Sequence, residues 1–247
     1  MMNFALQQAF EQRQALKVIS GLMNFDPARV AAIVRAATQG GATFVDIAAD
    51  PNLVQMARGL TSLPVCVSAV IPETFVTCVE AGANLIEIGN FDAFYAQGRR
   101  FQAEEVLALT QATRRLLPQV TLSVTVPHIL TLDQQVELAI ELVKAGANLI
   151  QTEGGTSARP FNSGTLGLIE KAAPTLAATY EISRAVSVPV LCASGLSNVT
   201  LPLAIAAGAS GVGVGSAINR LESEIEMVAA VRSLVEALQS TPILVNP

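Results

Sequence analysis

A nine-residue pattern recurs four times along the chain and joins the end of a helix to a buried strand. The copies read GGATFVDIA, AGANLIEIG, AGANLIQTE and AGASGVGVG, and they begin at Gly40, Ala81, Ala145 and Ala207. In each copy Gly-Ala ends a helix with a residue that tolerates left-handed backbone, and a short apolar strand follows. Strands that alternate with helices are typical of parallel βαβ units, so the pattern predicts an α/β fold.

Further apolar segments, each bounded by turn residues, complete a set of eight strands. We predict these strands at residues 17–21, 43–48, 64–70, 84–89, 120–126, 148–153, 189–194 and 210–215. Eight such units close a barrel, and 247 residues suit the roughly 250 of that fold. The rival is an open doubly wound sheet, but no GxGxxG follows the first strand. The prediction is a single (β/α)8 TIM-barrel domain over residues 1–247, with an extra N-terminal helix.

Turn and capping residues indicate where the helices lie. We expect the N-terminal helix at residues 3–14, where Phe4 and Phe10 would seal the bottom of the barrel. Pro72 is expected at a first helical position, which suits proline because its missing N–H costs nothing there. The helix after the sixth strand is expected near residues 174–186, which leaves a long loop before it.

Alternation along the four copies separates apolar from polar positions. The apolar positions must face the helices, so the polar ones are expected to point into the barrel. One layer would then hold Asp46, Glu87, Gln151 and Gly213, and the layer above would hold Ala48, Gly89, Glu153 and Gly215. The other strands add small polar residues to the same interior: Ser68, Ser123, Thr125 and Ser194.

Acidic residues inside a barrel are candidates for proton transfer, because burial and mutual repulsion raise carboxyl pKa values. Glu87, Glu153 and Asp46 are therefore predicted as catalytic, with a hydrogen-bonded structural network as the alternative. Lys17 opens the first strand and could reach these acids, but we expect it at the bottom rim with an exposed head group. Lys171 is expected to be solvated on a helix.

His128 is the only histidine and lies just past the fifth strand, on the side where barrel enzymes place catalytic residues. It is predicted as an acid–base group, and the alternative is a loop histidine packed against Pro127. No strand ends in a lysine, which disfavours Schiff-base chemistry. No recognisable zinc spacing occurs, so no metal is expected; a magnesium ion at Glu87 and Glu153 is a weaker alternative.

The turns after the last two strands are rich in Gly and Ser, and the phosphate site of such barrels typically lies there. The predicted phosphate-binding residues are Ser194, Gly195, Leu196, Gly215 and Ser216, with Ser197 or Asn198 capping the helix between these strands. The alternative is that the glycines serve only tight packing. Residues in the loop after the sixth strand are predicted to contact substrate: Gly154, Gly155 and Arg159. Its alternative is a surface excursion or a subunit contact.

Composition narrows the choice of partner. The net charge of −5 argues against nucleic acid. Only 14% of residues are charged while 51% are hydrophobic, so we expect a second copy of the chain to cover part of the surface. No signal peptide and no membrane-spanning run is apparent. The three cysteines are expected to be buried and reduced.

Three parts of the chain match a known sequence pattern: LKVISGLMNFD, QTEGGTS, and ASGLSNVT followed by GVGVGSAI. With these segments the chain resembles, over its full length, a family of cyanobacteria and algal plastids, the hypothetical chloroplast reading frame (Ycf) family numbered twenty-three. The resemblance implies a cyanobacterial cytosol or a plastid stroma. The last two turns are also similar to those of thiazole synthase, indole-glycerol-phosphate synthase and sugar-phosphate epimerases. The catalytic lysine of thiazole synthase belongs in the fourth strand, where this chain has Glu87, which argues against the same chemistry.

These observations favour an isomerase or lyase that acts on a small phosphorylated metabolite, with an unknown cofactor requirement. Two alternatives stay open. One is a non-catalytic barrel that senses a metabolite or supports an assembly, with its acids sealed in internal pairs. The other is a protein that binds flavin mononucleotide in the same phosphate site.

Overall fold

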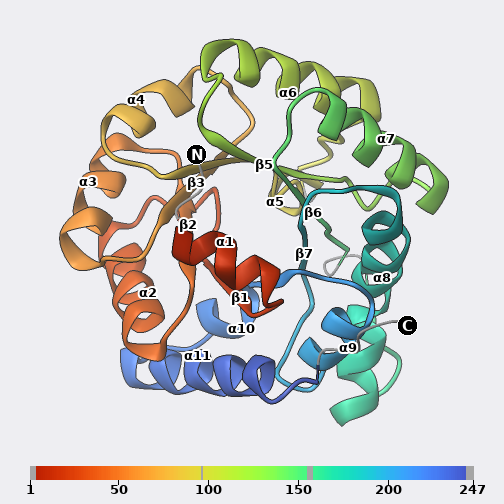
Figure 1. Ribbon diagram of the computed structural model, residues 1–247. Helices are drawn as coiled ribbons and strands as arrows, with labels where there is room; N and C mark the ends of the chain where they lie inside the picture. Colours follow the sequence, from red (N-terminus) through yellow and green to blue (C-terminus); the bar gives the residue numbers. More distant parts are fainter. Residues whose placement is uncertain (1–3, 96, 155–157, 243–247) are drawn as a thin grey trace.

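The computed structural model describes residues 4–95, 97–154 and 158–242, and in it eight parallel strands close into a ring (Figure 1). Each strand pairs with its neighbours in sequence, and β8 returns to pair with β1, which confirms the predicted (β/α)8 barrel. The strands are β1 (Ala15–Ile19), β2 (Phe44–Ala48), β3 (Val65–Ala69), β4 (Leu85–Ile88), β5 (Thr121–Thr125), β6 (Leu149–Gln151), β7 (Val190–Ala193) and β8 (Gly211–Val214).

Helices surround this ring, and α1 lies across one of its openings (Figure 1). They are α1 (Phe4–Glu11), α2 (Pro27–Gly40), α3 (Pro51–Leu60), α4 (Thr74–Glu80), α5 (Asp92–Tyr95), α6 (Ala103–Leu116), α7 (Leu132–Lys144), α8 (Gly164–Ala185), α9 (Leu201–Ala206), α10 (Ser216–Asn219) and α11 (Glu224–Gln239). The Gly of each repeated Gly-Ala pair has a positive φ, between 85° and 109°, as the repeat predicts.

The outer face of the strands packs against the helices. Val45, Ile86 and Ile150 belong to the large apolar cluster that also contains helix residues such as Ile33 and Val231. Ala48, which was expected in an interior layer of the barrel, also belongs to this large apolar cluster. At the end covered by α1, a smaller apolar cluster plugs the barrel with Leu6, Phe10, Ala15, Phe44, Cys66, Leu85, Leu149 and Leu191.

The prediction for the bottom seal is half right. Phe10 is buried and packs edge-on against Phe44, with ring centroids 6.0 Å apart. Phe4 is 81% exposed, so it takes no part in the plug. The difference follows from helical geometry, because residues six apart in a helix do not share a face.

Two helix starts and one helix cap differ from the predictions. Helix α8 begins ten residues before Pro174, which lies inside it, so the long loop before that helix is shorter than predicted. Proline is common at the first position of a helix because it lacks the N–H. The predicted start of α8 relied on this preference and was therefore wrong. Pro72 precedes α4 by two residues, in a turn. Helix α9 begins at Leu201, about one turn after Ser197 as expected, but the residue at its N-cap is Thr200 and not Ser197 or Asn198.

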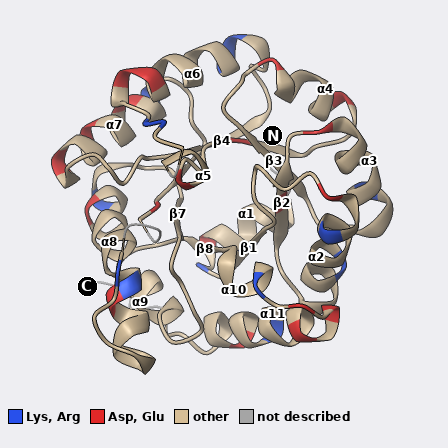
Figure 2. Cartoon of the chain, turned by 180° about the vertical axis from the view of Figure 1, so that it is seen from behind, with Lys and Arg blue, Asp and Glu red and all other residues tan. Residues whose placement is uncertain are grey.

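Charge lies mainly on the outer helices, as the view from the opposite end shows (Figure 2). The three cysteines are free and buried, as predicted. Among the residues that the structure describes, none of the helices has the length and apolar character needed to cross a membrane.

Candidate functional site

The centre of the barrel holds a lysine between two carboxylates. The Nζ atom of Lys17 donates to Glu87 Oε2 at 2.7 Å and to Gln151 Oε1 at 3.0 Å, and it lies 3.2 Å from Asp46 Oδ2. Lys17, Asp46 and Glu87 are each at most 1% exposed. The expected bottom-rim position of Lys17 with an exposed head group is therefore wrong: its ammonium group is buried inside the barrel among these side chains.

Neighbouring strands complete the hydrogen bonds of this central network. Ser68 Oγ donates to Asp46 Oδ1 at 2.6 Å, Ser123 Oγ donates to Glu87 Oε2 at 2.7 Å, and Gln151 Nε2 donates to Glu87 Oε1 at 2.8 Å. Asn90 Nδ2 lies above and donates to Glu87 Oε1 at 3.1 Å and to Asp46 Oδ2 at 3.3 Å. The inward orientation predicted for Asp46, Glu87 and Gln151 is confirmed.

Burial and charge oppose each other within this network. Burial raises the pKa of Glu87, and the nearby Lys17 ammonium counteracts part of that rise. For Lys17, burial lowers the pKa, but Asp46 and Glu87 together raise it above its ordinary value. The ammonium group is thus held charged where an unpaired cation would be strongly disfavoured.

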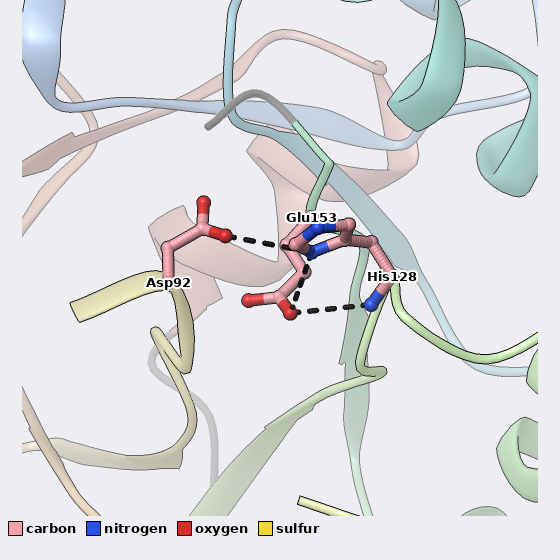
Figure 3. A group of neighbouring side chains, drawn as sticks. All are labelled: Asp92, His128 and Glu153. Carbon is pink, nitrogen blue, oxygen red and sulfur yellow. Dashed lines mark hydrogen bonds and ion pairs between the residues drawn. The ribbon is translucent and has the colours of Figure 1, made fainter. Parts of the chain in front are cut away.

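A second polar cluster lies at the mouth of the barrel, beyond the strand ends (Figure 3). Glu153 follows β6, His128 lies in the loop after β5, and Asp92 begins the one-turn helix α5. His128 Nδ1 lies 3.1 Å from Glu153 Oε1 and 3.4 Å from Asp92 Oδ1. The imidazole therefore lies between two carboxylates.

Glu153 is 4% exposed and firmly oriented through one oxygen. Its Oε1 accepts a hydrogen bond from the Tyr95 hydroxyl at 2.5 Å and another from the His128 backbone N–H at 3.2 Å. Its Oε2 is buried and has no hydrogen-bond partner among the described residues. Burial raises the pKa of Glu153, and the hydrogen bonds from His128 and Tyr95 offset only part of this rise.

The pKa of His128 is raised above its ordinary value of 6.5. Burial alone would lower it, but the hydrogen bond to Glu153 and the charges of Glu153 and Asp92 prevail. A carboxyl group in contact with a histidine at the mouth of a barrel is a candidate pair for proton transfer.

A cavity of about 500 Å³ opens at this mouth. Glu153 lines it, together with all five predicted phosphate-binding residues of the turns after β7 and β8. The floor includes Asn90 and Gln151, which touch the central network. Asp46 and Glu87 lie beneath this floor, so the structure brings Glu153 to the cavity and seals the other two predicted acids below it.

Two cations also line the cavity. Lys171 reaches it from α8 and Arg220 from the end of α10. Burial lowers the pKa of Lys171, and the charge of Arg220 lowers it further, so the two cationic groups are close enough to repel each other. Lys171 lies on a helix, as expected, but it is half-buried and lines the cavity.

Two of the three non-glycine residues with positive φ in the described part of the chain lie at the mouth. Asn90 and Ser194 have φ values of 60° and 78°, which are uncommon for residues other than glycine, and both line the cavity. Ser194 Oγ also donates to Asp92 Oδ2 at 3.2 Å. Next to it, Gly195 has φ +73°, and a Cβ there would lie 2.8 Å from the backbone oxygen of Lys171. The backbone of the turn after β7 therefore passes so close to α8 that only glycine fits at position 195.

The loop predicted to contact substrate is only partly described. Gly154 is buried, whereas Gly155 lies outside the described residues. Arg159 is exposed, and its neighbours Ala158 and Pro160 line the cavity. Its contact with substrate stays a prediction.

A larger cavity of about 890 Å³ lies at the opposite end of the barrel. It is lined by residues of α1, such as Phe10, and by residues at the starts of strands, such as Thr121 and Val190. Active sites of this fold lie at the other face, so size alone does not make it the functional site.

Sequence reasoning missed four residues of the mouth: Asp92, Tyr95, Lys171 and Arg220. Asp92 and Tyr95 lie on α5, a single turn that no periodic pattern reveals. Lys171 lies about one helical turn before Pro174. The predicted helix would have included Lys171 if its periodic pattern had been continued to residues before that proline.

The arrangement defines a class: a (β/α)8 barrel with an acid–histidine cluster and a cation-lined cavity at its carboxyl-terminal mouth. Solved structures share its fold. Thiamine phosphate pyrophosphorylase from Pyrococcus furiosus matches with a TM-score of 0.61 and 18% identity, covering 93% of this chain and 98% of that one. GGGPS from Thermoplasma volcanium matches with a TM-score of 0.64 and 14% identity, covering 97% and 98%.

Within that class, the chain belongs to the family described as "Protein of unknown function (DUF561)", whose model matches residues 1–244. It is 47% identical over 232 residues to "Uncharacterized protein ycf23" of Cyanophora paradoxa, covering 92% of this chain and 93% of that protein. The protein of the same description from Pyropia yezoensis is 40% identical over 230 residues, with 93% and 84% covered. These relatives confirm the resemblance to the plastid Ycf family.

Proposed function

We propose that the protein is an enzyme of the isomerase or lyase type that acts on a small phosphorylated molecule bound at the mouth of the barrel. One observation carries this proposal. A single cavity is lined both by the cationic pair Lys171 and Arg220 and by the buried carboxylate of Glu153. An anion-binding end and a proton-transfer group therefore face the same bound molecule.

The phosphate end combines backbone and side-chain donors. The turns at Ser194–Leu196 and at Gly215 and Ser216 supply backbone N–H groups beside two cations. Burial lowers the pKa of Lys171 and the charge of Arg220 lowers it further, and a phosphate dianion beside both cations would offset their mutual repulsion. The α9 and α10 helices have only six and four residues, so the turns and the cations carry this argument, and helix dipoles do not.

The proton-transfer end is Glu153, positioned by His128 and Tyr95. A carboxyl group whose pKa is raised by burial is suited to take a proton from carbon and return it, because its pKa lies nearer to neutral pH. This chemistry needs no redox cofactor, which is why isomerase or lyase activity is favoured. Asp46 and Glu87 were predicted as catalytic too; we now assign them to positioning, because they lie beneath the floor formed by Asn90 and Gln151.

We further propose that the chain forms a homo-oligomer in a cyanobacterial cytosol or a plastid stroma, the compartments that the family resemblance implies. Large apolar side chains on the surface support self-association: Ile225 is 83% exposed and Phe161 is 99% exposed.

Thermal unfolding with and without inorganic phosphate or glycerol phosphate tests the proposal. A ligand at about a hundred times its Kd stabilises the native state by about 2.7 kcal/mol, so the Tm should rise. The double variant Lys171→Gln/Arg220→Gln should lose this rise. Lys144→Gln removes an exposed lysine on α7 and should keep it. An equal rise in all three proteins, or no rise with any phosphorylated compound, would contradict the proposal.

A further inference from the structure

We propose that Asp92, His128 and Glu153 form a binding site for one divalent transition-metal ion of the zinc type. Each residue offers one ligand atom, and these atoms all lie within 4.8 Å of one another. The three residues come from α5, the loop after β5 and the end of β6, so the closed barrel brings them together (Figure 3).

The distances fit a shared ion. Two donor atoms that each lie about 2.0–2.1 Å from a tetrahedral zinc ion are about 3.3–3.4 Å apart. His128 Nδ1 lies 3.4 Å from Asp92 Oδ1 and 3.1 Å from Glu153 Oε1. The ligand atoms of Asp92 and Glu153 lie within 4.8 Å of each other, so these two carboxylates must move closer together for all three residues to share one ion.

An independent observation points to a missing partner at this position. Glu153 Oε2 is buried and unpartnered among the described residues, although the residue is 96% buried and lines the cavity. A buried carboxylate oxygen without a partner is costly, and a bound cation would satisfy it.

Surrounding groups already orient the two carboxylates, as is usual around metal ligands. The Tyr95 hydroxyl donates to Glu153 Oε1, and Ser194 Oγ donates to Asp92 Oδ2. The donor set of one imidazole and two carboxylates favours a borderline ion such as Zn²⁺ over Mg²⁺ or Ca²⁺, which prefer oxygen ligands alone. Three protein ligands leave an open position toward the cavity, as in catalytic zinc sites.

This inference deepens the proposed function and rests on it for its role in the reaction. The ion would polarise an oxygen of the bound phosphorylated molecule and stabilise negative charge that forms there. Glu153 would bind the ion through Oε2, the oxygen without a partner, while Oε1 keeps its hydrogen bonds from the Tyr95 hydroxyl and the His128 backbone N–H. Metal binding itself does not depend on the phosphate end of the cavity.

Isothermal titration of the chelator-treated full chain with ZnCl2, without any phosphorylated compound, provides the test. We expect one ion per chain. His128→Gln and Asp92→Asn should each weaken binding at least tenfold, whereas Glu104→Gln, an exposed carboxylate on α6, should leave it unchanged. Circular dichroism shows whether the variants are folded. No binding, or equal binding in folded His128→Gln, would overturn the proposal.

A second readout does not depend on variants. His128 is the only histidine, so its imidazole gives a single pair of ¹⁵N resonances. Zinc should shift the Nδ1 resonance; unchanged resonances under saturating zinc would overturn the site. The phosphate test is run with chelator present, so failure of metal binding and failure of phosphate binding are separate results.

Discussion

The ammonium group of Lys17 lies 2.7 Å from Oε2 of Glu87 on a strand across the barrel, and one buried cation thereby compensates carboxylates from two strands. Glu87 in turn holds Gln151 and Asn90, which form the floor of the mouth cavity. The central network therefore supports the site from below. We expect the central network to affect activity indirectly, because it stabilises the fold and fixes the position of this floor.

Replacing Lys17 with Met should strongly destabilise the fold. The change leaves Asp46 and Glu87 buried without their cation, and removing one partner of a buried ion pair typically costs roughly 3–5 kcal/mol. Urea unfolding measures the loss. The triple variant Lys17→Met/Asp46→Asn/Glu87→Gln should recover part of it, since no charge remains buried. A loss of less than about 1 kcal/mol in Lys17→Met would show that the network contributes little.

The single histidine should titrate above its ordinary value of 6.5. A proton bound more tightly in the folded state than in the unfolded state stabilises the fold fully below the unfolded pKa, and this contribution is lost as pH rises through the folded pKa. In Glu153→Gln the His128 pKa should fall, because burial remains while the hydrogen bond and charge that raise it are gone. NMR titration of the imidazole measures both values; a wild-type value at or below 6.5 would refute the pairing.

Gly40→Ala should destabilise the protein, although alanine favours helices. A Cβ at Gly40 of α2 would lie 2.5 Å from Cβ of Val231 on α11, and overpacking typically costs about 1–3 kcal/mol. Gly59→Ala on α3 is the matched control, because nothing lies within 4 Å of its Cβ position. There the helix propensity of alanine should add up to about 1 kcal/mol. Relative to the wild type, the free energy of unfolding should fall in Gly40→Ala and rise in Gly59→Ala. A rise in both variants would show that α2 and α11 can separate without cost.

Glu153→Gln should separate binding from chemistry. Phosphate should still raise the Tm, because Lys171 and Arg220 are untouched. Turnover of any phosphorylated substrate found by screening should fall by a factor of about 10² or more, the usual contribution of an acid–base group. Steady-state kinetics and thermal unfolding of the same variant give both quantities, and undiminished turnover would remove Glu153 from the mechanism.

The barrel and its interior acids could be predicted from the sequence because one repeat shows both where the helices end and which strand residues face inward. Its Gly-Ala pairs mark helix ends, and alternation in DIA, EIG and QTE separates the two faces of each strand. The same parity places Lys17 on the inner face with Ala15 and Ile19. What the sequence does not reveal is the set of partners that makes a buried ammonium tolerable, since they come from three other strands.

The mouth of the barrel was less predictable for a different reason. Its residues lie on loops and short turns, whose placement depends on tertiary contacts and not on periodicity. Asp92 is one example, because α5 is a single turn. Lys171 is another: Pro174 looks like a helix start, yet α8 continues through it and brings the lysine to the cavity.

The most direct test of the central claim is a crystal structure of the full chain soaked with glycerol phosphate. The phosphate should lie against the turns at Gly195 and Gly215, with Lys171 and Arg220 beside it and the carbon chain directed toward Glu153. A phosphate bound instead in the cavity at the opposite end, near Arg13 and Arg114, or a mouth that takes up no phosphate under saturating conditions, would contradict the account.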